Sequence, residues 1–341
     1  MKAAVLHGPG DLRVEDVREP RDPGPDEVTI AVQRCGLCGT DAHEYTHGGP
    51  MTPLKTPHPG SGHSGPTIIG HEFMGTVSRA GAEAGFGEGD RVVAGAGQWC
   101  GDCAACQAGR TNLCRRYFTY GLSTHGGMAE YVTVPAAMCV AVPESCPADN
   151  AVLAQPISIA MHALDRAQAP AGGEVLVIGA GGVGALLVAA AADRGLAVHV
   201  ADLDPARLRA AERLGAASTE LIEPGAETTS FTGLDRVFET SGSTSGLRLA
   251  LDATAPGARI VAVGLPGRPV EFDVRAAVVS EKDIVTSCAH VCRRDLPMAV
   301  DLLSRHDLRR EIVAQVLPLS EIHKGLTSPG KTVIDIHGRE H

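Results

Sequence analysis

Residues 174–184 read Glu-Val-Leu-Val-Ile-Gly-Ala-Gly-Gly-Val-Gly. The short apolar run at the start predicts a buried strand, and the small residues 185–194 that follow predict a helix. A second strand-like run, 197–201, ends at Asp202. The spacing G-x-G-x-x-G is informative only in this context, between a strand and a helix and with an acid after the next strand. That context is typical of a dinucleotide-binding turn.

The glycine-rich turn is expected to hold the pyrophosphate of NAD, because backbone N–H groups and the helix dipole favour anions at a helix start. Asp202 is expected to accept hydrogen bonds from the adenosine ribose and to repel a 2′-phosphate. Leu203 follows it in place of a basic residue, which favours NAD over NADP, whereas Arg207 argues for NADP. The residues expected to contact the cofactor are Gly179, Gly181, Gly182, Val183, Gly184, Asp202, Arg207, Gly264 and Leu265.

Strands and helices continue to alternate after this turn. Further strand-like runs are found at 236–239, 259–263 and 284–287. The alternation predicts an α/β domain with a doubly wound parallel sheet over residues 153–287. Gly264 and Leu265 lie just past a strand of this sheet, where the nicotinamide end of the cofactor is expected. Residues 1–152 and 288–341 are predicted to form a second domain.

The overall composition limits the classes of function. With 341 residues and 44% hydrophobic residues, the chain is expected to form two globular domains. A net charge of −10 and the lack of a Lys/Arg-rich run argue against a nucleic-acid partner. No signal-peptide pattern is evident, and the longest apolar run, 183–192, is too short to span a membrane. A cytoplasmic location without a membrane partner is therefore expected.

Four cysteines are closely spaced in the first half of the chain: Cys100, Cys103, Cys106 and Cys114. Clustered thiols in a cytoplasmic chain are more typical of metal binding than of disulfides. Four thiolates predict a closed tetrahedral zinc site with a structural role, because no coordination position remains for a substrate. An iron–sulfur cluster uses the same ligands and is the alternative.

A second group of reactive side chains lies in residues 35–45, Cys-Gly-Leu-Cys-Gly-Thr-Asp-Ala-His-Glu-Tyr. This stretch combines a thiol, a hydroxyl, an acid and an imidazole, which are Cys38, Thr40, Asp41 and His43. Gly36 and Gly39 are expected to let the backbone turn sharply. The side chains are suited to binding zinc and moving a proton. Taken alone, the stretch is equally typical of a redox-active Cys-x-x-Cys turn.

His71 and Glu72 follow a short apolar run that begins at Ile68. Together with Cys38 they offer a second zinc ligand and an adjacent carboxylate. Residues 46–66, between the two groups, contain five Gly and five Pro, which excludes a helix and predicts a long loop.

These motifs resemble those of the zinc-dependent medium-chain alcohol dehydrogenase family, over nearly the whole chain. The stretch 35–45, the insertion containing His58-Pro-Gly, the run Ile-Ile-Gly-His-Glu-Phe at 68–73 and Gly121-Leu-Ser are similar to those of (R,R)-butanediol and polyol dehydrogenases. The resemblance implies a mostly β, GroES-like catalytic domain with a zinc lobe, joined to a Rossmann domain. It also implies two zinc ions per chain and NAD as the cofactor.

The resemblance assigns roles to the reactive side chains. Cys38 and His71 are expected to bind the catalytic zinc, and Glu72 is expected to lie on or next to the metal. Thr40 matches the hydroxyl that contacts the substrate oxygen. His43 matches the outer end of a proton relay that begins at Thr40 and passes through the cofactor ribose.

One position departs from the family pattern. Gln155 stands where butanediol and polyol relatives usually have a glutamate as the third protein ligand of the zinc. A neutral amide would leave the site more positive than a carboxylate, which should make bound water or alcohol more acidic. Either Gln155 or Glu72 is expected to complete the ligand shell.

The implied activity is reversible hydride transfer between NAD(H) and a secondary alcohol or ketone, with zinc as the Lewis acid. A small vicinal diol, a hydroxyketone or a polyol is the expected substrate, and a sugar or cyclic biosynthetic intermediate is the alternative. Two different functions compete with this one, namely a zinc-free quinone or enoyl reductase and an inactive zinc-stabilised binding protein. The resemblance further implies a homodimer or homotetramer.

Overall fold

The computed structural model describes residues 1–338 and divides the chain into two compact units. Unit 1 contains residues 1–158 and the chain from Val291 onward, and unit 2 contains residues 159–290. The domain boundaries predicted from the sequence follow residues 152 and 287. The first of the two unit boundaries in the structure lies within helix α4 (Ala154–Ala167). Within the described part of the chain, no helix is both long and apolar enough to cross a membrane.

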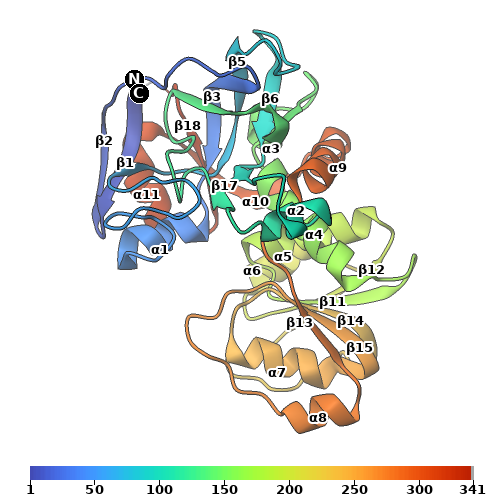
Figure 1. The fold of residues 1–341 in the computed structure, drawn as a ribbon. Coiled ribbons are helices and arrows are strands. Elements are labelled where there is room, and N and C mark those ends of the chain that lie inside the picture. Colours follow the sequence, from blue (N-terminus) through green and yellow to red (C-terminus); the bar gives the residue numbers. More distant parts are fainter. Residues whose placement is uncertain (339–341) are drawn as a thin grey trace. The chain divides into compact units, whose positions relative to one another are not determined.

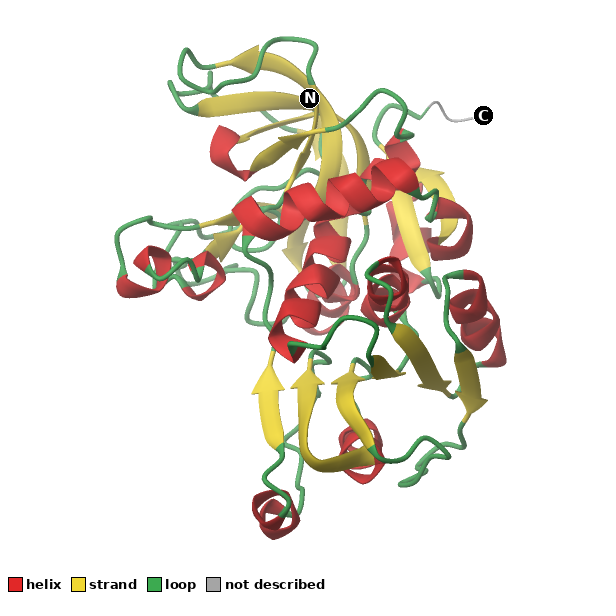
Figure 2. Cartoon of the chain, turned by 90° about the vertical axis from the view of Figure 1, so that its right-hand side faces the viewer, coloured by secondary structure: helices red, strands yellow, loops and turns green. Residues whose placement is uncertain are grey.

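Unit 2 is built on a six-stranded parallel sheet with the order β13-β12-β11-β14-β15-β16 (Figures 1 and 2). Its strands are β11 (Glu174–Ile178), β12 (Ala197–Asp202), β13 (Ser218–Leu221), β14 (Leu234–Glu239), β15 (Thr254–Ala262) and β16 (Asp283–Thr286). Its other helices are α5 (Gly182–Asp193), α6 (Pro205–Arg213), α7 (Thr244–Ala253) and α8 (Val274–Val279). The predicted doubly wound sheet is confirmed, although β13 was not predicted.

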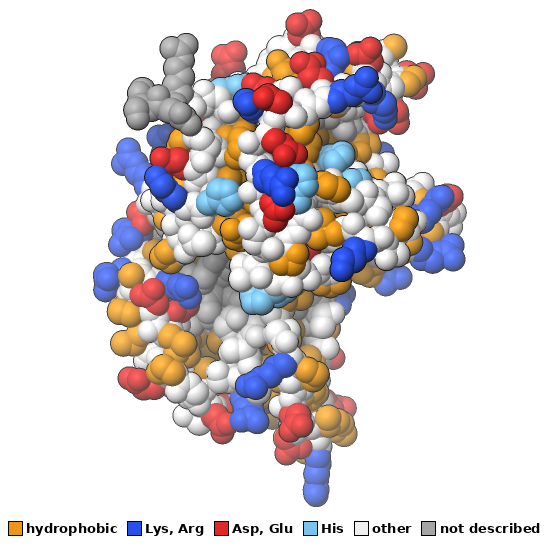
Figure 3. Space-filling view, turned by 90° about the vertical axis from the view of Figure 1, so that its left-hand side faces the viewer, with side chains coloured by type: hydrophobic (Ala, Val, Ile, Leu, Met, Phe, Trp, Pro, Cys, Tyr) orange, Lys and Arg blue, Asp and Glu red, His pale blue; other side chains and the backbone are white. Residues whose placement is uncertain are grey.

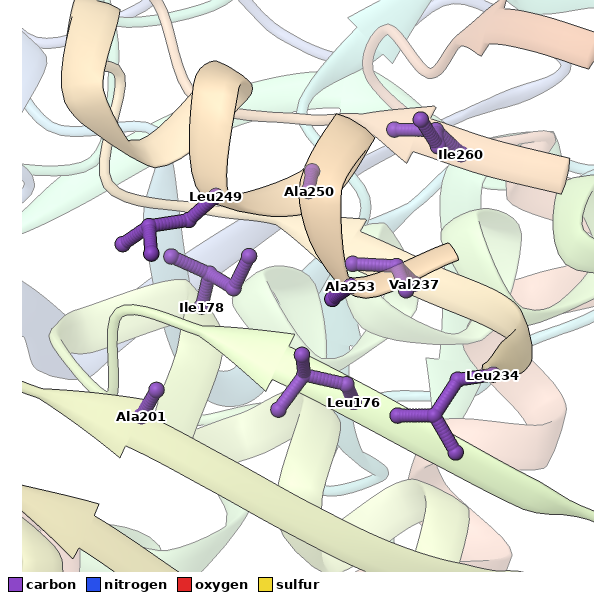
Figure 4. Close-up of a cluster of buried hydrophobic side chains, with 9 residues drawn as sticks. All are labelled: Leu176, Ile178, Ala201, Leu234, Val237, Leu249, Ala250, Ala253 and Ile260. Atoms are coloured by element: carbon purple, nitrogen blue, oxygen red, sulfur yellow. The ribbon is translucent and has the colours of Figure 1, made fainter. Parts of the chain in front are cut away.

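The core of unit 2 lies between its sheet and the helices. Figure 4 shows part of it, where Ile178 of β11 faces Leu249 of α7 and Leu176 of the same strand lies nearer Ala253. Helix α5 is buried from Gly184 to Ala191, as expected for a helix that is apolar on all sides. Because alanine is small, α5 can pack closely on the sheet. This packing fixes the turn before α5, which carries the glycine-rich motif.

Unit 1 is mostly β. Its larger sheet has the order β10-β6-β5-β3-β18-β17 with β9 also paired to β3, and a smaller sheet has the order β2-β1-β4. The strands are β1 (Lys2–Gly8), β2 (Asp11–Asp16), β3 (Glu27–Gly36), β4 (Thr67–Ile68), β5 (Glu72–Ala80), β6 (Arg91–Ala94), β7 (Gly97–Gln98), β8 (Phe118–Thr119), β9 (Tyr131–Pro135), β10 (Cys139–Ala141), β17 (Val313–Pro318) and β18 (Lys331–Asp335). The helices are α1 (Gly39–His47), α2 (Ala104–Gln107), α3 (Ala148–Ala151), α9 (Cys292–Arg305), α10 (Arg309–Ile312) and α11 (Ile322–Thr327).

The expectation of a sharp glycine turn within residues 35–45 was wrong. Neither Gly36 nor Gly39 has a positive φ, and Cys38 is instead the N-cap of α1. Gly36 is required for space, because a Cβ there would overlap the Glu72 carboxylate and lie 3.2 Å from the Lys331 amine. The residues around Cys38 therefore form a strand end and a helix start.

The face of the molecule in Figure 3 carries acidic and basic side chains interspersed with one another.

Candidate active site

The sheet of unit 1 brings together Cys38, His71 and Glu72, whose ligand atoms all lie within 4.8 Å of one another. The cause is the pairing of β3 with β5, in which Gly36 is opposite Glu72. The chain leaves β3 two residues before Cys38 and enters β5 one residue after His71. Residues more than thirty positions apart thus meet at one end of the sheet.

Asp41 lies next to both Cys38 and His71. Its carboxylate accepts the backbone N–H of Cys38 at 2.8 Å, and its other oxygen lies 3.5 Å from Nδ1 of His71. Burial alone would lower the pKa of His71, but the charges of Asp41 and Cys38 raise it well above its usual value. Burial would raise the pKa of Cys38, but His71 outweighs this effect and the thiol pKa is lowered. The site therefore favours a thiolate, the form of cysteine that binds metals.

Glu72 forms a buried ion pair with Lys331, the first residue of β18. The Lys331 amine also donates to the carbonyl oxygen of Leu37 at 3.1 Å. Burial acts to lower the pKa of Lys331, but Glu72 and Cys38 raise it above its usual value. Lys331 was not predicted from the sequence, because no local motif marks a lysine that lies 259 residues from its partner.

The remaining predicted side chains lie on α1 and α4. The Thr40 hydroxyl is 3.7 Å from the sulfur of Cys38. His43 is exposed one turn further along α1, and its ring lies 4.8 Å from that of His47. Gln155 is buried on α4, and its amide oxygen has no hydrogen-bond partner. An unpaired buried oxygen is costly unless a partner such as a metal ion occupies it.

The donor set fits zinc. A thiolate, an imidazole and a carboxylate or amide oxygen are ligands that zinc accepts, and three protein ligands leave a position for substrate. Asp41 Oδ1 lies 3.5 Å from Nδ1 of His71, and neither atom has another hydrogen-bond partner among the described residues. A small rotation of the ring would let Nδ1–H donate to this carboxylate, which is how metal-binding imidazoles are oriented.

Four sulfurs form a second cluster, those of Cys100, Cys103, Cys106 and Cys114, and they too lie within 4.8 Å of one another. Backbone N–H groups of Cys100 and Arg116 both donate to the sulfur of Cys114, each at 3.3 Å. Backbone N–H groups of Cys106 and Arg115 lower the pKa of Cys103 to about 6. These donors stabilise thiolates, as a closed four-cysteine zinc site requires.

The glycine-rich turn of unit 2 has the geometry of a dinucleotide site. Gly179 has a φ of +92°, which favours glycine, and Gly181 is the N-cap of α5. A Cβ on Gly184 would lie 2.7 Å from the Thr240 hydroxyl, so this position admits no side chain. Gly182 and Val183 form the first turn of α5, where backbone N–H groups are available for phosphate.

Asp202 closes β12 beside this turn. Its carboxylate accepts the N–H of Ala180 at 2.6 Å and that of Asp204 at 2.8 Å. Arg207 reaches to 3.8 Å from the same carboxylate with a half-exposed side chain. Gly264 and Leu265 follow β15 at the carboxyl end of the sheet, and Leu265 is exposed.

Comparison with known proteins supports both halves of this description. The model of the alcohol dehydrogenase GroES-like domain matches residues 24–144, and that of the zinc-binding dehydrogenase matches residues 182–305. The chain belongs to the zinc-containing medium-chain alcohol dehydrogenase family. It is therefore a zinc-type, NAD(P)-linked oxidoreductase of that family, and the predicted resemblance is confirmed.

Two curated members of the family are sorbitol dehydrogenase of Bacillus subtilis and erythritol/L-threitol dehydrogenase of Mycolicibacterium smegmatis. The first is 32% identical over 83% of this chain and 80% of its own length. The second is 33% identical over 96% of this chain and 93% of its own length.

Solved members of the family share the fold over the whole chain. The 2R,3R-butanediol dehydrogenase of Bacillus subtilis is 28% identical with a TM-score of 0.87, over 98% of this chain and 99% of its own. An alcohol dehydrogenase of Escherichia coli complexed with NADH is 25% identical with a TM-score of 0.85, over 98% of this chain and 99% of its own. A zinc-binding dehydrogenase of Sinorhizobium meliloti bound to NADP is 27% identical with a TM-score of 0.86, over 98% of both chains. Both nicotinamide cofactors thus occur among these relatives.

Proposed function

We propose that this dehydrogenase transfers a hydride between NAD(H) and a small secondary alcohol or ketone, with a vicinal diol, hydroxyketone or polyol as substrate. The observation that carries the proposal is the intact group of Cys38, His71 and Glu72, with the Thr40 hydroxyl 3.7 Å from the sulfur of Cys38. Relatives of this chain are named as dehydrogenases of butanediol, sorbitol and erythritol or threitol. These names support a short polyhydroxy compound as the substrate.

The test is a panel of alcohols and ketones assayed with NAD(H) and NADP(H), followed by nicotinamide absorbance. The panel contains short diols, linear polyols, aldoses and cyclic polyols. Preferred turnover of short diols or linear polyols would support the proposal. Preferred turnover of sugars or cyclic polyols would favour the alternative substrate class, and no turnover by zinc-loaded protein would contradict an enzymatic function.

Bound zinc would supply Lewis-acid polarisation of the substrate oxygen. The chain's own residues then hold and move the proton. Cys38 and His71 would hold the metal, and Asp41, 3.5 Å from Nδ1 of His71, would orient the His71 ring. Thr40 would accept the proton of the substrate hydroxyl and pass it through the cofactor ribose to His43, which is exposed on α1 and would exchange it with solvent.

Replacement of His43 by Ala is expected to lower the turnover of alcohol oxidation mainly at low pH. The reason is that hydroxide becomes scarce there as an alternative proton acceptor, so the relay matters most. A loss of about a hundredfold, partly restored by an added buffer base such as a substituted imidazole, is expected from general-base catalysis. The measurement is kcat against pH for both proteins, with His47→Ala as the matched control on the same helix. A wild-type-like profile for His43→Ala would remove His43 from the relay.

Gln155 is proposed as the third protein ligand of the zinc. Its amide oxygen is buried without a partner, whereas Glu72 is already paired with Lys331. Replacement by Glu would add a negative charge, so the metal would acidify the bound water or alcohol less. The pH profile of kcat/KM should therefore shift to higher pH by about one unit. An unchanged profile with unchanged zinc content would leave Glu72 as the ligand.

NAD is proposed as the preferred cofactor, because the Asp202 carboxylate lies beside the glycine-rich turn, where it would repel the 2′-phosphate of NADP. Replacement of Asp202 by Gly should remove the repulsion of a 2′-phosphate and leave Arg207, 3.8 Å away, to attract it. The ratio of kcat/KM for NAD to that for NADP should fall by about two orders of magnitude. Steady-state kinetics with both cofactors measure this ratio. A wild type that already prefers NADP would contradict the assignment.

A homodimer or homotetramer is proposed for the assembly. Strand β16 is an edge of the unit 2 sheet, and exposed apolar side chains lie nearby in sequence on α8, namely Val274, Val278 and Val279. Edge strands and exposed apolar side chains both favour association. Light scattering across a concentration range tests the assembly, and a monomer throughout would contradict it. A cytoplasmic location stays a prediction.

A further inference from the structure

A buried carboxylate at the end of β14 has no role in the proposed reaction. Glu239 is the last residue of β14 and is 3% exposed. One of its oxygens accepts the backbone N–H of Ser241 at 2.8 Å and that of Gly242 at 3.0 Å, together with the Ser241 hydroxyl. Every one of these donors is electrically neutral. Burial raises the pKa of Glu239 above its usual value, and these donors act to lower it. No described cation pairs with Glu239, so the negative charge of the ionised carboxylate has no counter-charge.

Two glycines leave room for this carboxylate. A Cβ on Gly246 would lie 2.7 Å from one oxygen of Glu239, and a Cβ on Gly264 would lie 2.8 Å from the other. Gly264 is one of the residues expected to face the nicotinamide. The second carboxylate oxygen therefore points to the segment that follows β15.

The same turn contacts the glycine-rich motif. Glu239 is in register with Ile178 on the neighbouring strand β11, and adjacent strands are about 4.8 Å apart. The Thr240 hydroxyl donates to the carbonyl oxygens of Ile178, at 3.0 Å, and Gly179. Glu239 thus lies one strand away from the phosphate-binding turn, on the side opposite Asp202 of β12.

This position determines which half of the cofactor Glu239 would affect. In a doubly wound sheet the pyrophosphate lies at the switch point, and the two nucleotide halves extend to opposite sides of it. With the adenosine ribose at Asp202, the nicotinamide half extends over the ends of β14 and β15. The nicotinamide ring is positively charged in NAD⁺ and neutral in NADH, whereas the rest of the molecule is the same. A buried negative charge without a counter-charge attracts the positive ring of NAD⁺ and has little effect on the neutral ring of NADH. It therefore stabilises bound NAD⁺ relative to bound NADH.

We propose that Glu239 is a specificity-determining residue that makes the dinucleotide site bind NAD⁺ more tightly relative to NADH. The inference rests on the proposed function, because it needs the nicotinamide cofactor in this site. Its consequence is easier release of the reduced cofactor relative to the oxidised one, and product release limits turnover in many enzymes.

The test measures equilibrium binding by the whole zinc-loaded protein at pH 8.5, using calorimetry with NAD⁺, NADH and ADP-ribose. Glu239→Gln keeps an acceptor oxygen and the shape but removes the charge. The ratio of the Kd for NAD⁺ to that for NADH should rise about tenfold. The Kd of ADP-ribose, which lacks nicotinamide, should stay within about twofold. Glu174→Gln, an exposed residue at the opposite end of β11, is the matched control and should leave the ratio unchanged.

A second variant keeps the test valid if Glu239→Gln does not fold. Ser243 is exposed in the same turn and caps α7 by accepting the N–H of Gly246 at 2.9 Å. Ser243→Asp preserves the cap and adds a carboxylate, so the ratio should fall several-fold. Ratios unchanged in the folded variants would overturn the inference, as would equal weakening of all three ligands. A wild-type protein that binds neither NADH nor ADP-ribose would instead contradict the proposed function.

Discussion

Replacement of Lys331 by Met should lower the free energy of unfolding by about 3–5 kcal/mol in zinc-free protein. The substitution leaves the Glu72 carboxylate, 2% exposed, without a counter-charge in the sheet of unit 1. Either the carboxylate stays ionised in a low-dielectric environment, or it takes up a proton, and both cost free energy. Zinc at the neighbouring ligands would compensate part of this charge, so the loss should be smaller in zinc-loaded protein. Denaturant unfolding of both forms measures the difference.

The control is the double variant Glu72→Gln, Lys331→Met. It removes both charges, and replacement of a whole buried pair is often close to neutral. Its stability should therefore lie well above that of the single Lys331→Met variant. Equal destabilisation of the single and double variants would show that Lys331 contributes packing rather than charge.

Replacement of Cys103 by Ser should abolish the order of the four-cysteine lobe. Structural zinc contributes on the order of 10 kcal/mol of folding free energy in small zinc domains, and the lobe has little other core. Zinc content should fall from two ions to one per chain. Trypsin should then cleave after Arg110, Arg115 and Arg116, which lie within the lobe. Mass spectrometry of the fragments and metal analysis provide the two measurements.

The matched control is Cys288→Ser, an exposed cysteine outside both sulfur clusters. It should keep both zinc ions and the wild-type pattern of cleavage. Retention of two zinc ions by Cys103→Ser, together with resistance to trypsin, would contradict a structural role for this metal.

The sequence predicted those features that contiguous residues encode. The glycine spacing after β11, the acid at the end of β12 and the four-cysteine spacing each occupy a short stretch with its own physical requirement. The parallel sheet of unit 2 followed from the alternation of strands and helices. Cys38 and His71 could be proposed as zinc ligands in the same way, because both residue types bind metals.

Other features depend on pairing between distant parts of the chain. The ion pair of Lys331 with Glu72 exists because β18 and β5 both pair with β3, and no local pattern specifies that arrangement. The role of Gly36 was misjudged for a related reason. Gly36 is needed because its lack of a side chain leaves room for those of Glu72 and Lys331, and not because the backbone turns there.

Unit 1 is made of two chain segments, one before and one after unit 2. This arrangement determines the order in which the two units can be completed during biosynthesis. Strand β18 lies between β3 and β17 in the sheet, but it follows the whole of unit 2 along the chain. Glu72 leaves the ribosome 259 residues before Lys331. At ordinary rates of translation, that separation corresponds to roughly 10–50 s. The parallel sheet of unit 2 can close within this interval, whereas the catalytic centre matures only afterwards.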